Sequence, residues 1–169
     1  MMHKGMTGLV LGGSVLLVAA QAFAQSPNQP DQRKQVLGQE LVAPGTLYSP
    51  GVRMGGTIYV AGLQGTDPST HKLPADFGQE VRNCLNNLGR VLKDGGMNYD
   101  DVMSVQIFLV DLSQFQQVND IYKEYFKVVY PARTTIQVAK LSLGSRIEIS
   151  AVAQKQEDAR NKSVVKQEK

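Results

Sequence analysis

The first candidates for chemistry are a few polar residues in segments that otherwise look like buried strands. Arg133 begins the strand-like part of YPARTTIQVAKL, and Glu148 alternates with Ile147 and Ile149 in RIEISAVA. An arginine side chain is always charged, planar and forked, so it suits two-point binding of a carboxylate. Tyr48 lies in the turn-rich approach to the sheet. Spacing alone leaves two readings open: an anion site on a sheet, or Arg133 and Glu148 paired with each other or with surface groups.

Most other catalytic arrangements lack the residues they need. After the first two dozen residues the chain has one histidine, His71, in a turn-rich loop, so neither a Ser-His-Asp set nor a Cys/His zinc cluster is indicated. The glycine pairs in MGGT and DGGM precede a strand and end a helix, respectively, so no phosphate-binding loop is predicted. Cys84 lies at helical spacing among apolar residues and is expected to be a core thiol. We therefore expect no metal and no cofactor.

The N-terminal segment has the pattern of an export signal. Lys4 precedes an uncharged apolar run, 6–20, and Ala22-Phe23-Ala24 matches a small-x-small cleavage site, so residues 1–24 are predicted to be a signal peptide. The alternative is a membrane anchor, but the run is shorter than the ~20 residues of a span. The mature protein is thus expected in the periplasm or outside the cell, without a membrane span. Residues 25–32 are interpreted as a linker before one domain, 33–153.

Charge does not favour a nucleic-acid partner. Residues 25–153 carry twelve basic and twelve acidic side chains, and the basic excess lies in Lys4 and in the polar tail, 154–169, which has five bases and three acids. Such a tail is typical of a solvated, frayed chain end. Because the core has no net positive charge and no pair of histidines, ribonuclease chemistry is disfavoured.

Hydrophobic periodicity predicts the elements that position these residues. The expected order begins with an edge strand near Val36 and Leu37, a turn-rich stretch, a strand at 56–63 and a helix at 76–94, which Gly95-Gly96 ends. A strand at 101–110 with two apolar faces follows, and then a helix from 111 to 129 with a Ser113–Gln116 capping box. The last two elements are the Arg133 strand and a strand at 146–153. This order predicts an α+β fold with two helices on one face of a single mixed sheet. The other face would need cover, so we expect a homo-oligomer.

Taken together, these segments resemble the YjgF-like or Rid (reactive intermediate deaminase) family, whose older labels include endoribonuclease L-PSP. The resemblance runs from about Arg33 to Ala153, and the combination of PARTTIQVAKL with IEI is its specific part. It implies a chorismate-mutase-like fold and a homotrimer with clefts between subunits. It also implies hydrolysis of 2-imino acids and enamines, such as 2-aminoacrylate and 2-iminopropanoate, to 2-oxo acids and ammonia.

The resemblance also assigns roles to residues. It implies that the substrate is held by Arg133, Thr135, Gly62, Tyr48 and Asn119, with Arg133 gripping the carboxylate. Glu148 is implied to position the attacking water. The chain departs from the family pattern at Pro50, Leu63 and Ser150; at Leu63 a glutamine commonly follows the cleft glycine. An alternative activity is a non-catalytic trimer that binds small carboxylates or acts as a chaperone-like module.

Overall fold

Six strands form one sheet in the computed structural model, which describes residues 34–155. The strands are β1 (Gln35–Leu37), β2 (Gly51–Met54), β3 (Thr57–Gln64), β4 (Val102–Leu109), β5 (Ala132–Gln137) and β6 (Ile147–Gln154), and the helices are α1 (Phe77–Asp94) and α2 (Phe115–Tyr125). Their order across the sheet is β1-β2-β3-β6-β4-β5, with β4 and β5 parallel and all other neighbours antiparallel. The sheet is therefore mixed, as predicted. The predicted signal peptide and linker, and the tail beyond residue 155, lie outside the described residues.

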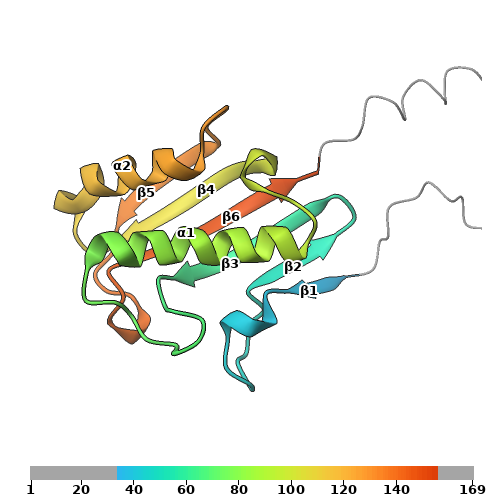
Figure 1. Ribbon diagram of the computed structural model, residues 1–169, viewed down its shortest axis with the longest axis horizontal. Coiled ribbons are helices and arrows are strands. Elements are labelled where there is room, and N and C mark those ends of the chain that lie inside the picture. Colours follow the sequence, from blue (N-terminus) through green and yellow to red (C-terminus); the bar gives the residue numbers. More distant parts are fainter. Residues whose placement is uncertain (1–33, 156–169) are drawn as a thin grey trace, which may run out of the picture.

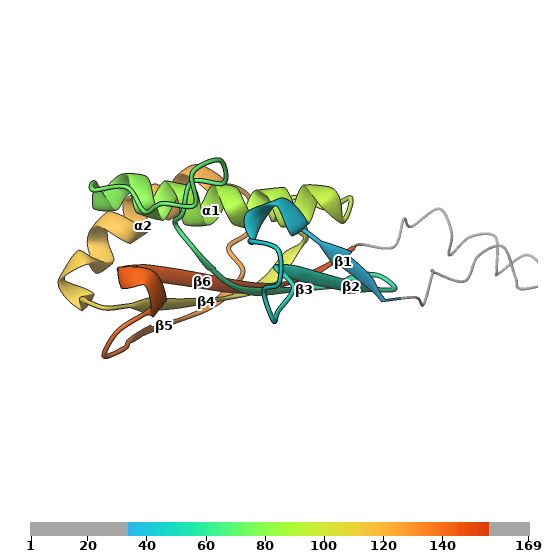
Figure 2. The ribbon, with the colours of Figure 1, turned by 90° about the horizontal axis from the view of Figure 1, so that it is seen from below.

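Both helices lie on one face of the sheet, which confirms the predicted α+β layers (Figure 2). In Figure 1, α1 crosses β3 and β6, whereas α2 lies beside β4 and β5. The carboxylate of Asp76 accepts a hydrogen bond from the Gln79 amide and caps α1, and the helix ends at Gly95 and at Gly96, whose φ is +69°. A positive φ favours glycine, so the predicted stop has a physical cause.

The core lies between the helices and the sheet. The residues of β6 that face α1 are Ile147, Ile149, Ala151 and Ala153, and all four are buried. Burying one such isoleucine contributes roughly 1.5–3 kcal/mol. Cys84 is fully buried among them, and this burial raises the pKa of its thiol well above the ordinary range. The prediction of a core thiol is thus confirmed.

Five local predictions were wrong in detail. The segment 43–56, expected to be turns, contains β2, because Gly55 and Gly56 make a tight connection that lets it pair with β3. The second helix ends at Tyr125 instead of residue 129, and Asp111 accepts the Ser113 amide where a Ser113 cap was expected. In β4 a bulge between Val102 and Ser104 turns Met103 to the outside. The last strand includes Gln154, one residue into the predicted tail.

The face of the sheet away from the helices carries apolar side chains. Tyr59, Met103 and Ile136 are 60%, 61% and 45% exposed, and Phe108 lies half-buried among them. The strand β4 is therefore covered on one face within this chain, and its other apolar face still needs cover, as expected from the sequence. A patch of this kind is typical of a surface that another protein chain covers.

Candidate active site

Arg133 stands at the edge of the sheet, on the face that the helices cover. In the parallel register of β4 and β5 it is the partner of Val105, which is buried under the helices. Its Nη2 donates a hydrogen bond of 2.9 Å to Oδ1 of Asn119 on α2. Its guanidinium carbon lies 4.8 Å from the centre of the Tyr122 ring. A guanidinium held against a ring face and one amide oxygen keeps its other N–H groups free for a ligand.

The local sequence of α2 explains this placement. Val118, Ile121 and Tyr122 form the buried stripe of the helix, and Asn119 lies three residues before Tyr122 on the adjoining side. The Tyr122 ring stacks on Phe126, with 4.3 Å between ring centres. The resulting Arg133 pocket has a volume of about 400 Å³ and is lined by α2, Tyr130, Pro131 and Arg133 itself. Asn119 and Arg133 are therefore brought together as the resemblance implied.

Two hydroxyl groups on the same side of the sheet lack a hydrogen-bond partner within residues 34–155. They are the Tyr122 hydroxyl and Oγ1 of Thr135, and both atoms are buried. Burial raises the pKa of Tyr122 to about 12, and the nearby Arg133 opposes this only in part. Tyr122 is hence a neutral hydrogen-bond donor at physiological pH. Thr135 lies two residues beyond Arg133 on the same face of β5.

Glu148 lies on the opposite face of the sheet. Its neighbours in register are Gln64 on β3 and Phe108 on β4, and its Oε2 accepts a hydrogen bond of 3.3 Å from Nε2 of Gln64. A bulge between Val60 and Leu63 places Gly62 directly beside the carboxylate. A Cβ atom at Gly62 would lie 2.2 Å from Oε1 of Glu148, so any side chain at this position would displace the carboxylate.

The Glu148 cleft around this carboxylate has a volume of about 570 Å³. Tyr48, Gly62 and Glu148 all line it, which brings together three of the residues that the resemblance assigned. Apolar and polar groups from three separate loops complete the walls, among them Leu41, His71 and Leu143. The cleft thus offers one carboxylate in a surface that is open to a small ligand.

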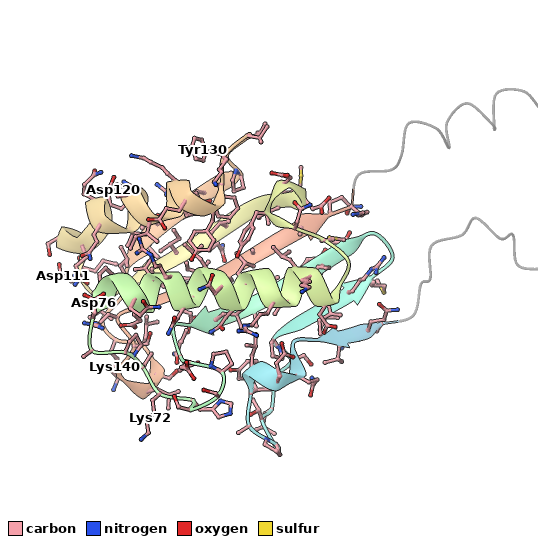
Figure 3. The ribbon with its side chains drawn as sticks, in the orientation of Figure 1. Lys72, Asp76, Asp111, Asp120, Tyr130 and Lys140 are labelled. Atoms are coloured by element: carbon pink, nitrogen blue, oxygen red, sulfur yellow. The ribbon has the colours of Figure 1, made fainter. Side chains whose placement is uncertain are left out.

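The six candidate residues therefore form two groups within one chain. Arg133, Asn119 and Thr135 belong to the helix-covered side, whereas Tyr48, Gly62 and Glu148 belong to the other. Figure 3 shows the separation: Tyr130 marks the Arg133 pocket and Lys72 marks the loop beside the Glu148 cleft, at opposite edges of the molecule. In residues 34–155 no ion pair joins Arg133 to Glu148. The reading in which these two charges pair with each other in one chain is wrong, because strand alternation sends them to opposite faces.

Sequence reasoning missed several polar residues that support these groups. Leu63 is a core residue, 4% exposed, and the next residue, Gln64, is the one that meets Glu148. Asn87 is buried and donates to the backbone oxygens of Gln64 and Thr66 at 3.1 and 3.0 Å, which holds the end of β3. No local sequence pattern predicts these contacts, because each joins residues more than twenty positions apart in the chain.

An ion pair with a buried carboxylate was missed as well. Glu80 is fully buried, and its carboxylate accepts hydrogen bonds from Nε of Arg146 at 2.6 Å, from the Arg146 amide at 2.7 Å and from the Ser145 hydroxyl at 2.8 Å. Arg146 also donates to the carbonyls of Pro74 and Ala75. One signal was present: Glu80 falls four residues before Cys84 on the apolar stripe of the helix, where a charge needs a partner.

Among residues 34–155, no group of three or more His, Cys, Asp and Glu side chains is placed to hold a metal ion. None of the helices in that part of the chain is both long and apolar enough to cross a membrane.

Comparisons with known proteins find relatives of this chain in sequence and in fold. The family model described as Endoribonuclease L-PSP matches residues 38–155. The 2-iminobutanoate/2-iminopropanoate deaminase of Homo sapiens is 44% identical over 114 residues, which cover 66% of this chain and 83% of that protein. The crystal structure of the YjgF gene product from E. coli is 30% identical with a TM-score of 0.68, covering 72% of this chain and 99% of that one. The structure of E. coli TdcF with bound serine is 29% identical with a TM-score of 0.67, over the same shares.

Proposed function

The chain belongs to the endoribonuclease L-PSP family, the YjgF or Rid family, and from this premise we propose that it hydrolyses 2-imino acids and their enamine tautomers to 2-oxo acids and ammonia. The human relative is named a deaminase of 2-iminobutanoate and 2-iminopropanoate. The observation that carries the proposal is Arg133, which has no carboxylate partner among residues 34–155 and lines an open pocket. A cation of this kind, fixed by Asn119 and Tyr122, is suited to the carboxylate that every 2-imino acid carries.

The reaction needs few protein groups. The C=N carbon of an imino acid is already electrophilic, so orientation and one polarised water can suffice. Arg133 holds the 2-carboxylate, and the Glu148 carboxylate orients a water molecule and accepts its proton as the oxygen attacks. Glu148 then passes this proton to the nitrogen of the tetrahedral adduct. The C–N bond breaks, and the hydroxyl proton of the adduct leaves with the ammonia as the 2-oxo acid forms. Tyr48 and Gly62 shape the cleft beside Glu148.

Arg133 and Glu148 can act on one substrate only if they meet across a boundary between chains. We therefore place the complete site between two subunits of a homotrimer, where the Arg133 pocket of one subunit faces the Glu148 cleft of the next. The exposed apolar residues on the open sheet face support such an assembly.

The test generates 2-imino acids with an amino-acid oxidase and follows their loss with and without the protein. Arg133→Ala should remove the acceleration, and Arg133→Lys should restore little of it, because a lysine cannot make a forked contact. Arg82→Lys is the matched control, since Arg82 makes only a surface ion pair with Glu124. If wild type and both Arg133 variants match the uncatalysed rate, the deaminase proposal fails.

The same variants test the alternative, a non-catalytic module that binds small carboxylates. TdcF was solved with bound serine, so amino-acid carboxylates are the natural probes. A wild-type protein without catalysis that binds pyruvate through Arg133 would support the binding module. Binding that survives Arg133→Ala would rule out the anion site itself.

We also propose that the chain is exported and acts in the periplasm or outside the cell, after loss of residues 1–24. There it would meet imines that amino-acid oxidases or dehydrogenases release. N-terminal sequencing of the native protein tests this: a start at Gln25 supports export, and an intact Met1 contradicts it.

A further inference from the structure

Gln64 links three parts of the Glu148 cleft through one amide nitrogen. Its Nε2 lies 2.6 Å from Oγ of Ser142, 3.2 Å from the carbonyl oxygen of Ser142 and 3.3 Å from Oε2 of Glu148. Gln64 belongs to β3, Glu148 to β6, and Ser142 to the short turn Ser142–Gly144 that precedes β6. One side chain therefore ties a strand, a turn and the carboxylate together.

The chemistry of the acceptors fixes the orientation of this amide. A backbone carbonyl and a carboxylate oxygen only accept hydrogen bonds, so the amide nitrogen must face them and the amide oxygen must point away. Gln64 therefore donates a hydrogen bond to Oε2 of Glu148. The other oxygen, Oε1, lies over Gly62 and faces the space that a side chain at that position would fill. Gln64 thus selects which carboxylate oxygen is presented to the cleft.

The turn that Gln64 holds forms part of the cleft wall. Leu143 has a φ of +56° and is 77% exposed, although it lines the Glu148 cleft. A leucine in the left-handed region is strained and persists only where its neighbours hold the backbone. The contacts from Gln64 to both the hydroxyl and the carbonyl of Ser142 supply such a restraint next to Leu143. The same amide therefore fixes both the carboxylate and the wall beside it.

We propose that Gln64 is a positioning residue, which holds Glu148 with Oε1 toward the attacking water and is itself held by Ser142. This inference rests on the deaminase function proposed above. Gln64 touches neither substrate nor water in this assignment; it acts through Glu148. Its removal should therefore slow the chemical step and leave substrate binding through Arg133 unchanged.

Kinetics of three variants test the proposal. Gln64→Met keeps the length of the side chain but has no donor, and kcat should fall about tenfold, which corresponds to about 1.4 kcal/mol in the barrier. KM should stay within about twofold, because substrate binding resides in Arg133. Ser142→Ala should lower kcat less, and the double variant should be no slower than Gln64→Met, since both changes break one network. Gln154→Met, at the far end of β6, is the matched control and should leave kcat unchanged.

Two results would overturn the proposal: an unchanged kcat in Gln64→Met, or a change in KM alone. Crystal structures of wild type and Gln64→Met separate this inference from the deaminase function. If the wild-type protein proves inactive, the proposed function fails. The position of the Glu148 carboxylate in the two crystal structures still tests whether Gln64 holds it. The carboxylate should leave Gly62 in the variant, and an unmoved Glu148 would contradict the assignment.

Discussion

Mixed oligomers of two inactive variants should recover activity. Arg133→Ala removes the cation from one group of site residues, and Glu148→Gln removes the base from the other. Each variant alone leaves every cleft incomplete. Losing two charge-assisted hydrogen bonds of about 1.5–3 kcal/mol each from Arg133 predicts a fall of roughly two to four orders of magnitude in kcat/KM. The residual activity of the Arg133→Ala protein should therefore be low enough for restored activity in the mixed oligomers to be measured.

The size of the recovery follows from the two groups of residues on opposite faces of the sheet. In an equal, random mixture a cleft is complete when a subunit with intact Arg133 lies beside a subunit with intact Glu148 in the right order. This holds for about a quarter of the clefts in any ring of subunits. The assay unfolds and refolds the two variants together, confirms mixed oligomers by native mass spectrometry, and measures hydrolysis of oxidase-generated imino acids. About a quarter of wild-type activity should return.

Failure of this recovery would refute a site shared between subunits. If mixed oligomers form and the rate stays at background, both groups of residues must act within one chain or not act together. The control mixes Glu148→Gln with Gly62→Ala, two changes in the same cleft. No combination of these subunits supplies an intact Glu148 cleft, so no activity should return.

Three further outcomes follow from the structure. Gly62→Ala puts a Cβ 2.2 Å from Oε1 of Glu148, so kcat should fall about tenfold or more while the melting temperature stays close to wild type. Glu80→Ala leaves the buried Ser145 hydroxyl and the partly exposed Arg146 without their shared acceptor and should reduce the free energy of unfolding in urea by about 1–3 kcal/mol. Glu124→Ala at the surface should change it by about 0–1 kcal/mol. Burial raises the pKa of Tyr122 from 10.0 to about 12 in the folded protein. The unfolded chain loses this proton at lower pH than the folded protein, so the contribution of Tyr122 to stability is full below pH 10 and declines up to about pH 12. In Tyr122→Phe the urea unfolding midpoint should therefore fall less steeply between pH 10 and pH 12. An unchanged dependence of the midpoint on pH would contradict the assignment.

The parts of the fold that could be predicted are those with strong periodicity. The helix that became α1 has five apolar residues on one stripe and a glycine pair at its end, so its bounds were expected to within one residue. The strand β2 was missed because GVRM has only four residues, and its pairing depends on the Gly55–Gly56 connection more than on its own composition. The bulge at Met103 likewise arises from pairing with β6, which no local pattern reveals.

Some residues of the candidate site could likewise be predicted from the sequence, and others could not. Arg133 and Glu148 stood out because charges in apolar strands are uncommon. The family resemblance supplied Gly62, Asn119 and Thr135 and gave Tyr48 its role. Gln64 could not be singled out, since its role depends on a strand and a turn that approach it only in the folded chain. Sequence alternation identified which residues share a face within one strand, but not which strands are neighbours.

If the site lies between two subunits as proposed, the separation of Arg133 from Glu148 gives it a property that neither residue has alone. If both charges lay on one face of one chain, they would form an ion pair, and a substrate carboxylate would have to break it before binding. Register prevents this, because Arg133 is the partner of Val105 on the helix-covered face while Glu148 is the partner of Phe108 on the open face. Arg133 is left with Asn119, a neutral acceptor, and Glu148 with Gln64, a neutral donor. Each charge is thus oriented but not neutralised. In the proposed site between two subunits, a substrate carboxylate would bind Arg133 without competing against Glu148 of the same chain.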